Sequence, residues 1–229
     1  VIIEPRWVVH RSFDVTFKHH QTLGLKVIVT ADWHFTKQAL WRVMTHARAE
    51  TIIADINKAH PDIILIAGDL IAEPTQKSVF APTVEEEIAQ TLAHLKASKG
   101  VYAVLGNHDN WYNHARMKQA LEQQHIQVLE NAASYNNAAQ LWIAGVGDAM
   151  TGHAKPANTV SQIPIHAPTL LMMHDPVSFT ELPTLNSISV AGHTHGGQIY
   201  MPWLGAIVSP SRAPRSWAYG WVKHHHHWM

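Results

Sequence analysis

The chain of 229 residues contains no cysteine. This absence excludes disulfides, thiolate metal sites and cysteine nucleophiles, so histidine and carboxylate side chains remain as the available metal ligands. The chain also lacks a block of like charges, and its 17 Lys and Arg residues balance its 17 Asp and Glu residues. Because proteins that bind nucleic acid usually present a basic patch, we expect no nucleic acid among the partners.

Long apolar runs are missing as well. None reaches the roughly 18 residues of a membrane-spanning helix, and no signal-peptide pattern is present. The chain begins with Val1 rather than Met, which leaves room for an upstream segment such as an anchor. The length predicts one large domain over residues 1–229 with a substantial core.

Strands and helices alternate in the first half of the sequence. The runs "LKVIVTA" at 25–31, "DIILIAGDL" at 62–70 and "VYAVLGNHD" at 101–109 are typical of buried strands. Segments with helical spacing lie between them, at 38–60 and 83–100. This alternation predicts a largely parallel sheet covered by helices.

The pattern changes after a further helix at about 113–124. Five short apolar runs follow with few helical segments between them: "IQVL", "LWIAGVG", "TLLMMH", "SISVAG" and "QIYMP". They predict a second sheet. At the other end of the chain, "VIIEPRWVVHRSFDVTF" alternates in places, and we expect residues 1–24 to add one or two strands.

Metal-competent side chains follow the carboxyl ends of the predicted strands. The chain has 19 histidines, and several stand at these ends together with Asp and Asn. In strand order the residues are Asp32 and His34; Asp69; Asn107, His108 and Asp109; His174 and Asp175; and His193 and His195. Ligands of open α/β sheets bind at this edge, so we expect these side chains to converge. Seven ligands of these types are too many for one tetrahedral ion but suit two divalent ions that share a bridging carboxylate, about 3.5–4 Å apart.

Each motif also has a structural interpretation. Asp-x-His after a strand is a common turn with a helix N-cap, and Gly-Asp and Gly-Asn are common turn dipeptides. His174 alone, among apolar residues, is typical of a hydrogen-bonded core histidine. His193 and His195 are two residues apart, so in an extended segment both face one way while Thr194 points away. The order of all five motifs favours a metal site over five separate turns.

This ordered set resembles the calcineurin-like metallophosphoesterase superfamily. Within it, "VLGNHDNWY", "HDP" and "GHTHGGQIYMP" resemble a bacterial branch that includes membrane-associated phosphodiesterases and a UDP-2,3-diacylglucosamine pyrophosphatase. The resemblance implies an α/β fold, a four-layer α-β-β-α sandwich of two mixed sheets flanked by helices, with a catalytic core over 25–222. Related chains continue into further strands, so we expect C-terminal strands of the second sheet to be missing here.

The resemblance also implies the roles of the strand-end residues. Asp32, His34 and His195 would hold one metal ion, Asn107, His174 and His193 a second, and Asp69 would bridge the two. His108 would protonate the leaving group or stabilise the phosphoryl oxygens, and Asp109 would orient His108. Oxygen and imidazole ligands suit manganese, iron or zinc, and the resemblance favours manganese.

Aromatic side chains stand beside these motifs. Trp33, Trp111 and Trp203 are candidates for contact with an apolar part of the substrate, such as a lipid, although such rings also simply pack loops. We therefore expect hydrolysis of a phosphodiester or pyrophosphate bond, with a lipid-linked substrate at a membrane surface. The alternatives are a non-catalytic metal- or phosphate-binding module and a phosphomonoesterase or protein phosphatase. The last would carry an arginine where Asp109-Asn110-Trp111 stands.

Overall fold

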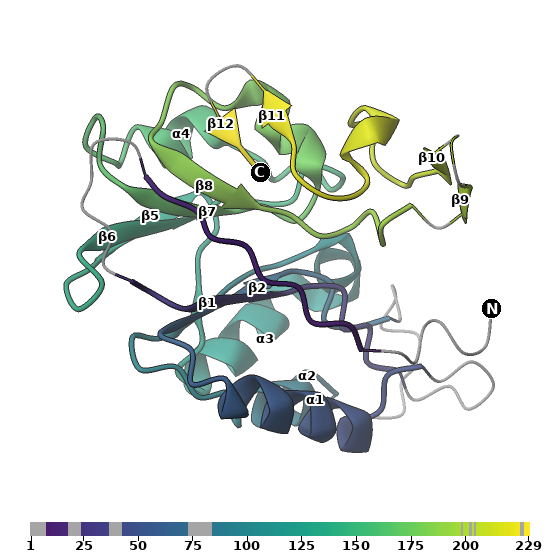
Figure 1. The fold of residues 1–229 in the computed structure, drawn as a ribbon. Helices are drawn as coiled ribbons and strands as arrows, with labels where there is room; N and C mark the ends of the chain where they lie inside the picture. The colour runs from purple at the N-terminus through teal and green to yellow at the C-terminus, as the bar shows by residue number, and fades with distance from the viewer. Residues whose placement is uncertain are drawn as a thin grey trace.

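Two β-sheets pack against each other, and helices cover the outer face of each (Figure 1). The computed structural model describes residues 8–17, 24–36, 43–72, 84–197, 199–201, 203, 205–224 and 227–229. Within these residues the expected α/β architecture of two sheets with flanking helices is confirmed.

The first sheet has the order β1-β2-β3-β4 and is parallel throughout. Its strands are β1 Val27–Thr30, β2 Ile63–Ala67, β3 Val101–Val104 and β4 Gln127–Val128. Its outer face is covered by α1 His46–Lys58, α2 Val84–Leu92 and α3 Asn107–Gln123. Every residue of β2 is buried, as expected for a parallel strand that is covered on both faces.

The second sheet has the order β11-β12-β8-β7-β6-β5. Its strands are β5 Ala132–Asn136, β6 Leu141–Gly145, β7 Thr169–Met172, β8 Ser187–Val190, β11 Lys223–His224 and β12 His227–Trp228. Strands β6, β7, β8 and β12 are parallel, while β5 and β11 join antiparallel, so this sheet is mixed. Shorter helices accompany it: α4 Pro156–Val160, η2 Pro176–Glu181 and η3 Arg215–Trp217. A separate hairpin is formed by β9 Ile199–Met201 and β10 Gly205–Val208.

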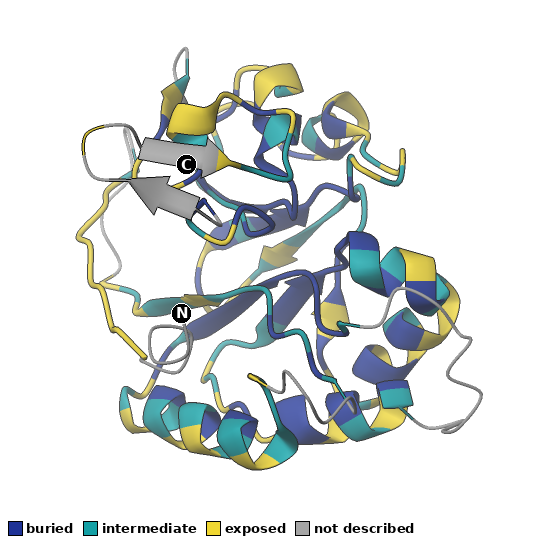
Figure 2. Cartoon of the chain, turned by 90° about the vertical axis from the view of Figure 1, so that its right-hand side faces the viewer, coloured by how far each residue is buried: buried dark blue, intermediate teal, exposed yellow. Residues whose placement is uncertain are grey.

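The core is divided by the two faces of the first sheet. Because successive side chains of a strand point to opposite faces, Ile64 and Ile66 of β2 pack under the helices, while Ile63 and Leu65 pack against the second sheet. Figure 2 shows the resulting band of buried strands between half-exposed helices. The loops after the carboxyl ends of the parallel strands of both sheets are thereby held on a rigid base.

The elements differ from the sequence expectations in several places. Two of the five runs expected in the second sheet lie elsewhere, because "IQVL" contributes β4 of the first sheet and "QIYMP" contributes β9 of the separate hairpin. The helix expected over 83–100 ends at Leu92. The first helix begins at His46, where Thr45 accepts a hydrogen bond from the Arg48 amide, and residues 37–42 of the expected helix lie outside the described residues. The helix expected from 113 begins at 107 and is interrupted at Asn113, whose side chain caps its second half through the Arg116 amide. Strand β5, with the sequence "AASYN", was not predicted because it lacks an apolar run.

The expectation of strands in the N-terminal segment is wrong for its described part. Residues 8–17 form no strand, and residues 1–7 and 18–23 lie outside the described residues. The side chains of residues 8–16 are exposed, so their apolar alternation has no sheet face to bury. Instead the segment runs as an extended strap across the front of both sheets (Figure 1). No helix among the described residues is long and apolar enough to cross a membrane.

Candidate metal centre

Five loops meet where the parallel strands of the two sheets end. Backbone hydrogen bonds join them in pairs: the Asp32 amide donates to the Gly68 carbonyl, the His34 amide to Asp69, and the Gly192 amide to His174, each at 3.0 Å. The structure thus brings the loops that carry the motifs together at this edge. Asp175 does not join them, because its carboxylate caps η2 and accepts from the Val177 amide at 3.0 Å.

One group of ligand atoms comes from Asp32, His34 and His195. The Nε2 atoms of His34 and His195 lie 3.2 Å apart. Asp32 is held in place by the His193 amide, which donates to its Oδ1 at 3.1 Å and its Oδ2 at 3.0 Å. The group therefore joins the ends of β1 and β8.

A second group comes from Asp69, His174 and His193. His174 Nε2 lies 3.2 Å from His193 Nδ1, 3.3 Å from Asp69 Oδ2 and 3.1 Å from Asn107 Oδ1. Asp69 Oδ2 also lies 3.6 Å from His34 Nε2. Asp69 consequently stands between the two groups.

A divalent cation fits these donors. His174 Nδ1 donates to the Ala67 carbonyl at 2.8 Å, which directs Nε2 toward a carboxylate, an amide oxygen and an imidazole nitrogen. Ligating histidines usually make such a bond through their other nitrogen. The separations of 3.1–3.3 Å between His34 and His195 and around His174 Nε2 are shorter than twice the usual metal–ligand bond of about 2.1 Å, so one ion can touch both atoms of such a pair.

The electrostatics of the second group favour positive charge at His174. Burial lowers its pKa, but the hydrogen bond and charge of Asp69 outweigh burial and raise the pKa of His174 to about 10. Burial likewise raises the pKa of Asp69, but His174 and His34 bring it down to about 2. Burial lowers the pKa values of His34 and His193. A proton or a metal ion is therefore favoured beside the Asp69 carboxylate.

The ligand loops have an unusual backbone. Asp32, His34, Asp69, His193 and His195 all have φ between 46° and 68°. Asp and His tolerate this left-handed region better than most residues, but each such residue still costs about 1 kcal/mol or more. The surrounding structure must hold these conformations, which turn the side chains sharply out of the strand ends.

Two glycines allow the loops to approach. A Cβ atom on Gly106 would lie 2.2 Å from Asp69 Oδ1 and 2.5 Å from its amide nitrogen. One on Gly192 would lie 2.9 Å from the Ala67 carbonyl oxygen. Neither position has room for a side chain.

His108 lies at the edge of the centre. It forms a third group of ligand atoms with His34 and Asp69, and its ring centroid is 4.9 Å from that of His34. Its Nδ1 donates to the Ala72 carbonyl at 2.8 Å, and its amide donates to Asp69 Oδ1 at 3.0 Å.

The expectation that Asp109 orients His108 is wrong. Asp109 is fully buried, and its carboxylate accepts hydrogen bonds from the amides of Leu70, Ile71 and Gly106 at 2.9, 3.1 and 2.9 Å. Adjacent helical residues point about 100° apart, so Asp109 does not face the same way as His108. Asp109 lies in the first turn of α3, and its carboxylate points back to the N-terminal end of that helix. Burial, followed by the charge of Asp69, raises the pKa of Asp109 to about 7. Asp109 ties the Asp69 loop to the Asn107 loop, while a main-chain carbonyl orients His108.

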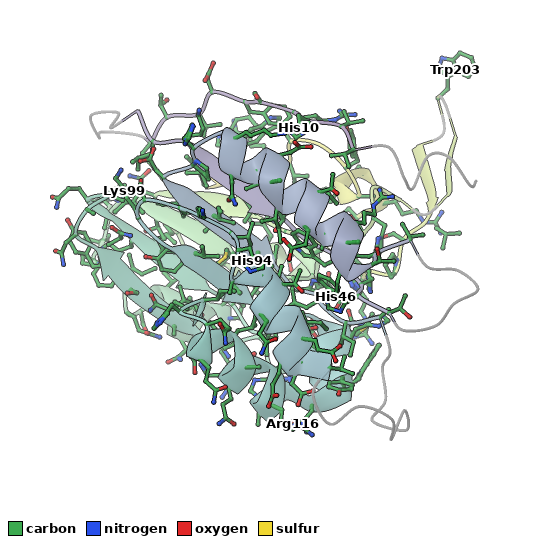
Figure 3. The ribbon with its side chains drawn as sticks, turned by 90° about the horizontal axis from the view of Figure 1, so that it is seen from below. His10, His46, His94, Lys99, Arg116 and Trp203 are labelled. Atoms are coloured by element: carbon green, nitrogen blue, oxygen red, sulfur yellow. The ribbon has the colours of Figure 1, made fainter. Side chains whose placement is uncertain are left out.

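The three tryptophans differ in their placement. Trp33 is buried in the core and stacks on Phe35 at 5.9 Å, so its expected contact with substrate is wrong. Trp203 is fully exposed at the turn between β9 and β10 and points away from the body of the protein (Figure 3), so the structure does not bring it to the centre. Trp111 is half-exposed with its ring 5.5 Å from that of His108.

Backbone groups are the part of the site that sequence reasoning missed. The Ala72 carbonyl and the Leu70 and Ile71 amides carry no side-chain signal, although their position directly after "GD" is a hint. Thr194 was expected to point away from the centre, and its hydroxyl donates to the Ala218 carbonyl at 2.9 Å. The segment before β11 therefore supports the "GHTHG" loop.

The two packed sheets and the paired histidine and carboxylate groups are those of a calcineurin-like phosphoesterase. This family matches residues 25–206, and the chain belongs to it. It is 28% identical over 194 residues to the metallophosphoesterase YkuE of Bacillus subtilis, covering 82% of this chain and 64% of YkuE. It is 26% identical over 216 residues to the phosphodiesterase YaeI of Escherichia coli, covering 90% of this chain and 74% of YaeI. It also matches the Caenorhabditis elegans metallophosphoesterase F40B5.2, at 32% identity over 67% of this chain and 34% of that protein.

Proposed function

We propose that the chain hydrolyses a phosphodiester or pyrophosphate bond with the help of two divalent metal ions. The observation that carries this proposal is the position of Asp69 between two groups of imidazole and carboxylate donors. In the proposed arrangement Asp32, His34 and His195 would hold one ion, Asn107, His174 and His193 would hold the other, and Asp69 would contribute to both. The family resemblance favours manganese. Iron and zinc are the alternatives, because oxygen and imidazole ligands suit all three metals.

The protein residues have separate tasks in this proposal. The divalent ions supply Lewis acidity, which promotes ionisation of water and offsets charge on the phosphoryl oxygens. His108 holds a proton for the leaving-group oxygen, and the Ala72 carbonyl fixes its ring through Nδ1. Asp109 keeps the Asp69 and Asn107 loops in register. His108 is thus a catalytic residue and Asp109 a positioning residue.

Metal analysis combined with hydrolysis of bis(p-nitrophenyl) phosphate tests the proposal. With manganese supplied, wild type should hold two ions and turn over the diester. Asp69→Asn should lose metal, whereas His108→Ala should keep both ions and lose activity by about 10²–10⁴-fold. His94→Ala serves as the control, because His94 is an exposed histidine just after α2 whose ring contacts Glu50 of α1. Two bound ions without turnover in wild type would favour the non-catalytic binding module instead.

We further propose a substrate with an apolar substituent, such as the lipid-linked UDP-2,3-diacylglucosamine, presented at a membrane surface. The support is Trp111, which leaves half of its ring exposed beside His108, together with the phosphodiesterase activity that the name of YaeI states. Trp111→Ala should lower hydrolysis of this lipid diphosphate more than hydrolysis of bis(p-nitrophenyl) phosphate. An equal loss on both substrates would remove the support.

A further inference from the structure

Four aromatic side chains gather on the outside of the protein where the N-terminal strap meets the C-terminal segment. This aromatic face consists of Phe13, Tyr219, Trp221 and Trp228, which are 58%, 50%, 43% and 44% exposed. The Phe13 and Trp221 rings meet edge to face at 5.3 Å, and Trp221 lies 6.5 Å from Trp228. Rings that contact one another and stay half-exposed form a contiguous apolar patch, which is typical of an interaction site.

Cations accompany these rings. The Arg11 guanidinium lies 4.9 Å from the centre of the Tyr219 ring, and Lys223 Nζ lies 5.4 Å from that of Trp228. Arg212 and Arg215 are also exposed on this segment. After Glu181 the chain has no Asp or Glu, so among the described residues of the strap and the C-terminal segment Asp14 is the single acidic side chain.

The aromatic face adjoins the metal centre. Ala218, next to Tyr219, accepts the hydrogen bond of Thr194, which stands between His193 and His195. A Cβ atom on Gly196 would lie 3.6 Å from Tyr219 Cδ2. A surface bound at the aromatic face would therefore be held beside the "GHTHG" loop.

We infer that the aromatic face binds the surface of an anionic lipid bilayer. Tryptophan and tyrosine rings settle at the level of lipid head groups, and arginine and lysine beside them attract anionic lipid. A second copy of the chain is a poor occupant, because a symmetric contact would bring two like-charged sets of side chains together: Arg11, Arg212, Arg215 and Lys223 of each copy. The inference rests on the proposed function in one respect only: bilayer binding would present a lipid-linked substrate to the metal centre.

Co-sedimentation of the full chain with phospholipid vesicles tests this inference without relying on hydrolysis. We expect binding to vesicles of phosphatidylcholine mixed with phosphatidylglycerol, little binding to phosphatidylcholine alone, and release by added salt. The double change Phe13→Ser, Trp221→Ser and the double change Arg11→Gln, Lys223→Gln should each weaken binding about tenfold or more. Tyr135→Ser, which alters an exposed aromatic residue of β5 at the other edge of the second sheet from β11 and β12, should bind as wild type does.

Several outcomes would overturn the inference. Wild type that fails to bind the anionic vesicles would do so, as would a Phe13→Ser, Trp221→Ser protein that is folded by circular dichroism and binds unchanged. A dimer in sedimentation velocity that these two changes disperse would assign the face to a second copy instead. Vesicle binding without hydrolysis, or hydrolysis of bis(p-nitrophenyl) phosphate without vesicle binding, separates failure of the proposed function from failure of this inference.

Discussion

The ring nitrogens Nε2 of His34 and His195 lie 3.2 Å apart although 161 residues separate them in the chain. They come from different sheets, one from the loop after β1 and one from the loop after β8. Two neutral imidazoles gain little from such an approach, whereas a shared cation stabilises it. His174 Nε2 and His193 Nδ1 of the second group approach equally closely, at 3.2 Å, beside the Asp69 carboxylate. The centre is thus built from pairs that a cation would hold together.

Metal ions should therefore stabilise the fold. At free Mn²⁺ of about 100 times the dissociation constant, the free energy of unfolding should rise by about 2.7 kcal/mol per site. For a chain of this size each kcal/mol raises Tm by about 2–4 °C. Thermal unfolding with Mn²⁺ and with EDTA measures the difference. Asp69→Asn should show a much smaller rise, and an equal rise in this variant would contradict the assignment of Asp69 as the bridge.

Asp109 should matter for stability more than a surface carboxylate does. Asp109→Asn replaces one of the oxygens that accept the Leu70, Ile71 and Gly106 amides by a donor, so it leaves buried N–H groups unpaired. We expect a loss of about 2–4 kcal/mol in the free energy of unfolding, measured in urea. Asp14→Asn, at an exposed position, should change it by less than about 0.5 kcal/mol. Similar values for the two variants would mean that Asp109 does not tie the loops together.

The left-handed backbone at His195, with φ of 50°, makes a prediction that concerns the backbone alone. Without metal, His195→Gly should be more stable than His195→Ala by about 1 kcal/mol, because glycine adopts this region without strain. His94 does not have positive φ, so there the order should reverse, with alanine the more stable. Urea unfolding in EDTA compares the four variants. The same order at both positions would show that the His195 conformation is not strained.

Asp62 provides a pH-dependent contribution to stability at the amino end of the first sheet, the end opposite to the metal centre. Its carboxylate accepts hydrogen bonds from the Lys99 ammonium, from the Lys26 amide at 2.9 Å and from the Ser98 hydroxyl at 3.0 Å. The Lys99 ammonium, followed by the Lys26 amide, lowers the pKa of Asp62 to about 2. An acid whose pKa is lower when folded stabilises the protein above its unfolded pKa of about 3.9, and loses this contribution as pH falls toward the folded value.

Asp62→Asn should consequently cost about 1 kcal/mol near neutral pH, a value reduced for the quarter exposure of both side chains. The difference from wild type should shrink between about pH 5 and pH 3. Urea unfolding across this range measures it. A difference that stays constant with pH would mean that the charge of Asp62 is not responsible.

Much of the fold could be predicted because local pattern and tertiary environment agree. The run "IILIA" predicts a fully buried strand, and all five residues of β2 are buried. The apolar pattern predicted the structure less well where the tertiary environment differs from what the pattern indicates. Residues 8–17 alternate like a strand but find no sheet edge, and "AASYN" forms an edge strand without an apolar run.

At the centre, the residue types and the order of the motifs were enough to predict that the candidate ligands lie at one edge, since parallel strands all end there. The direction in which each side chain points was harder to predict. Trp33 stands between two candidate ligands, yet its side chain is buried in the core against Phe35. Asp109 stands beside His108, yet the first turn of a helix sends its carboxylate to backbone amides.

The sequence by itself determined the alternation of strands and helices, the absence of thiolate chemistry and the set of side chains at the strand ends. These follow from local periodicity and residue chemistry, which do not depend on distant contacts. The tertiary structure alone decided that Asp69 lies between two donor groups, that Asp109 ties two loops together, and that the two ends of the described chain share an aromatic face. Each of these joins segments far apart in the chain, and only strand pairing within a sheet and the packing of one sheet on the other set such distances.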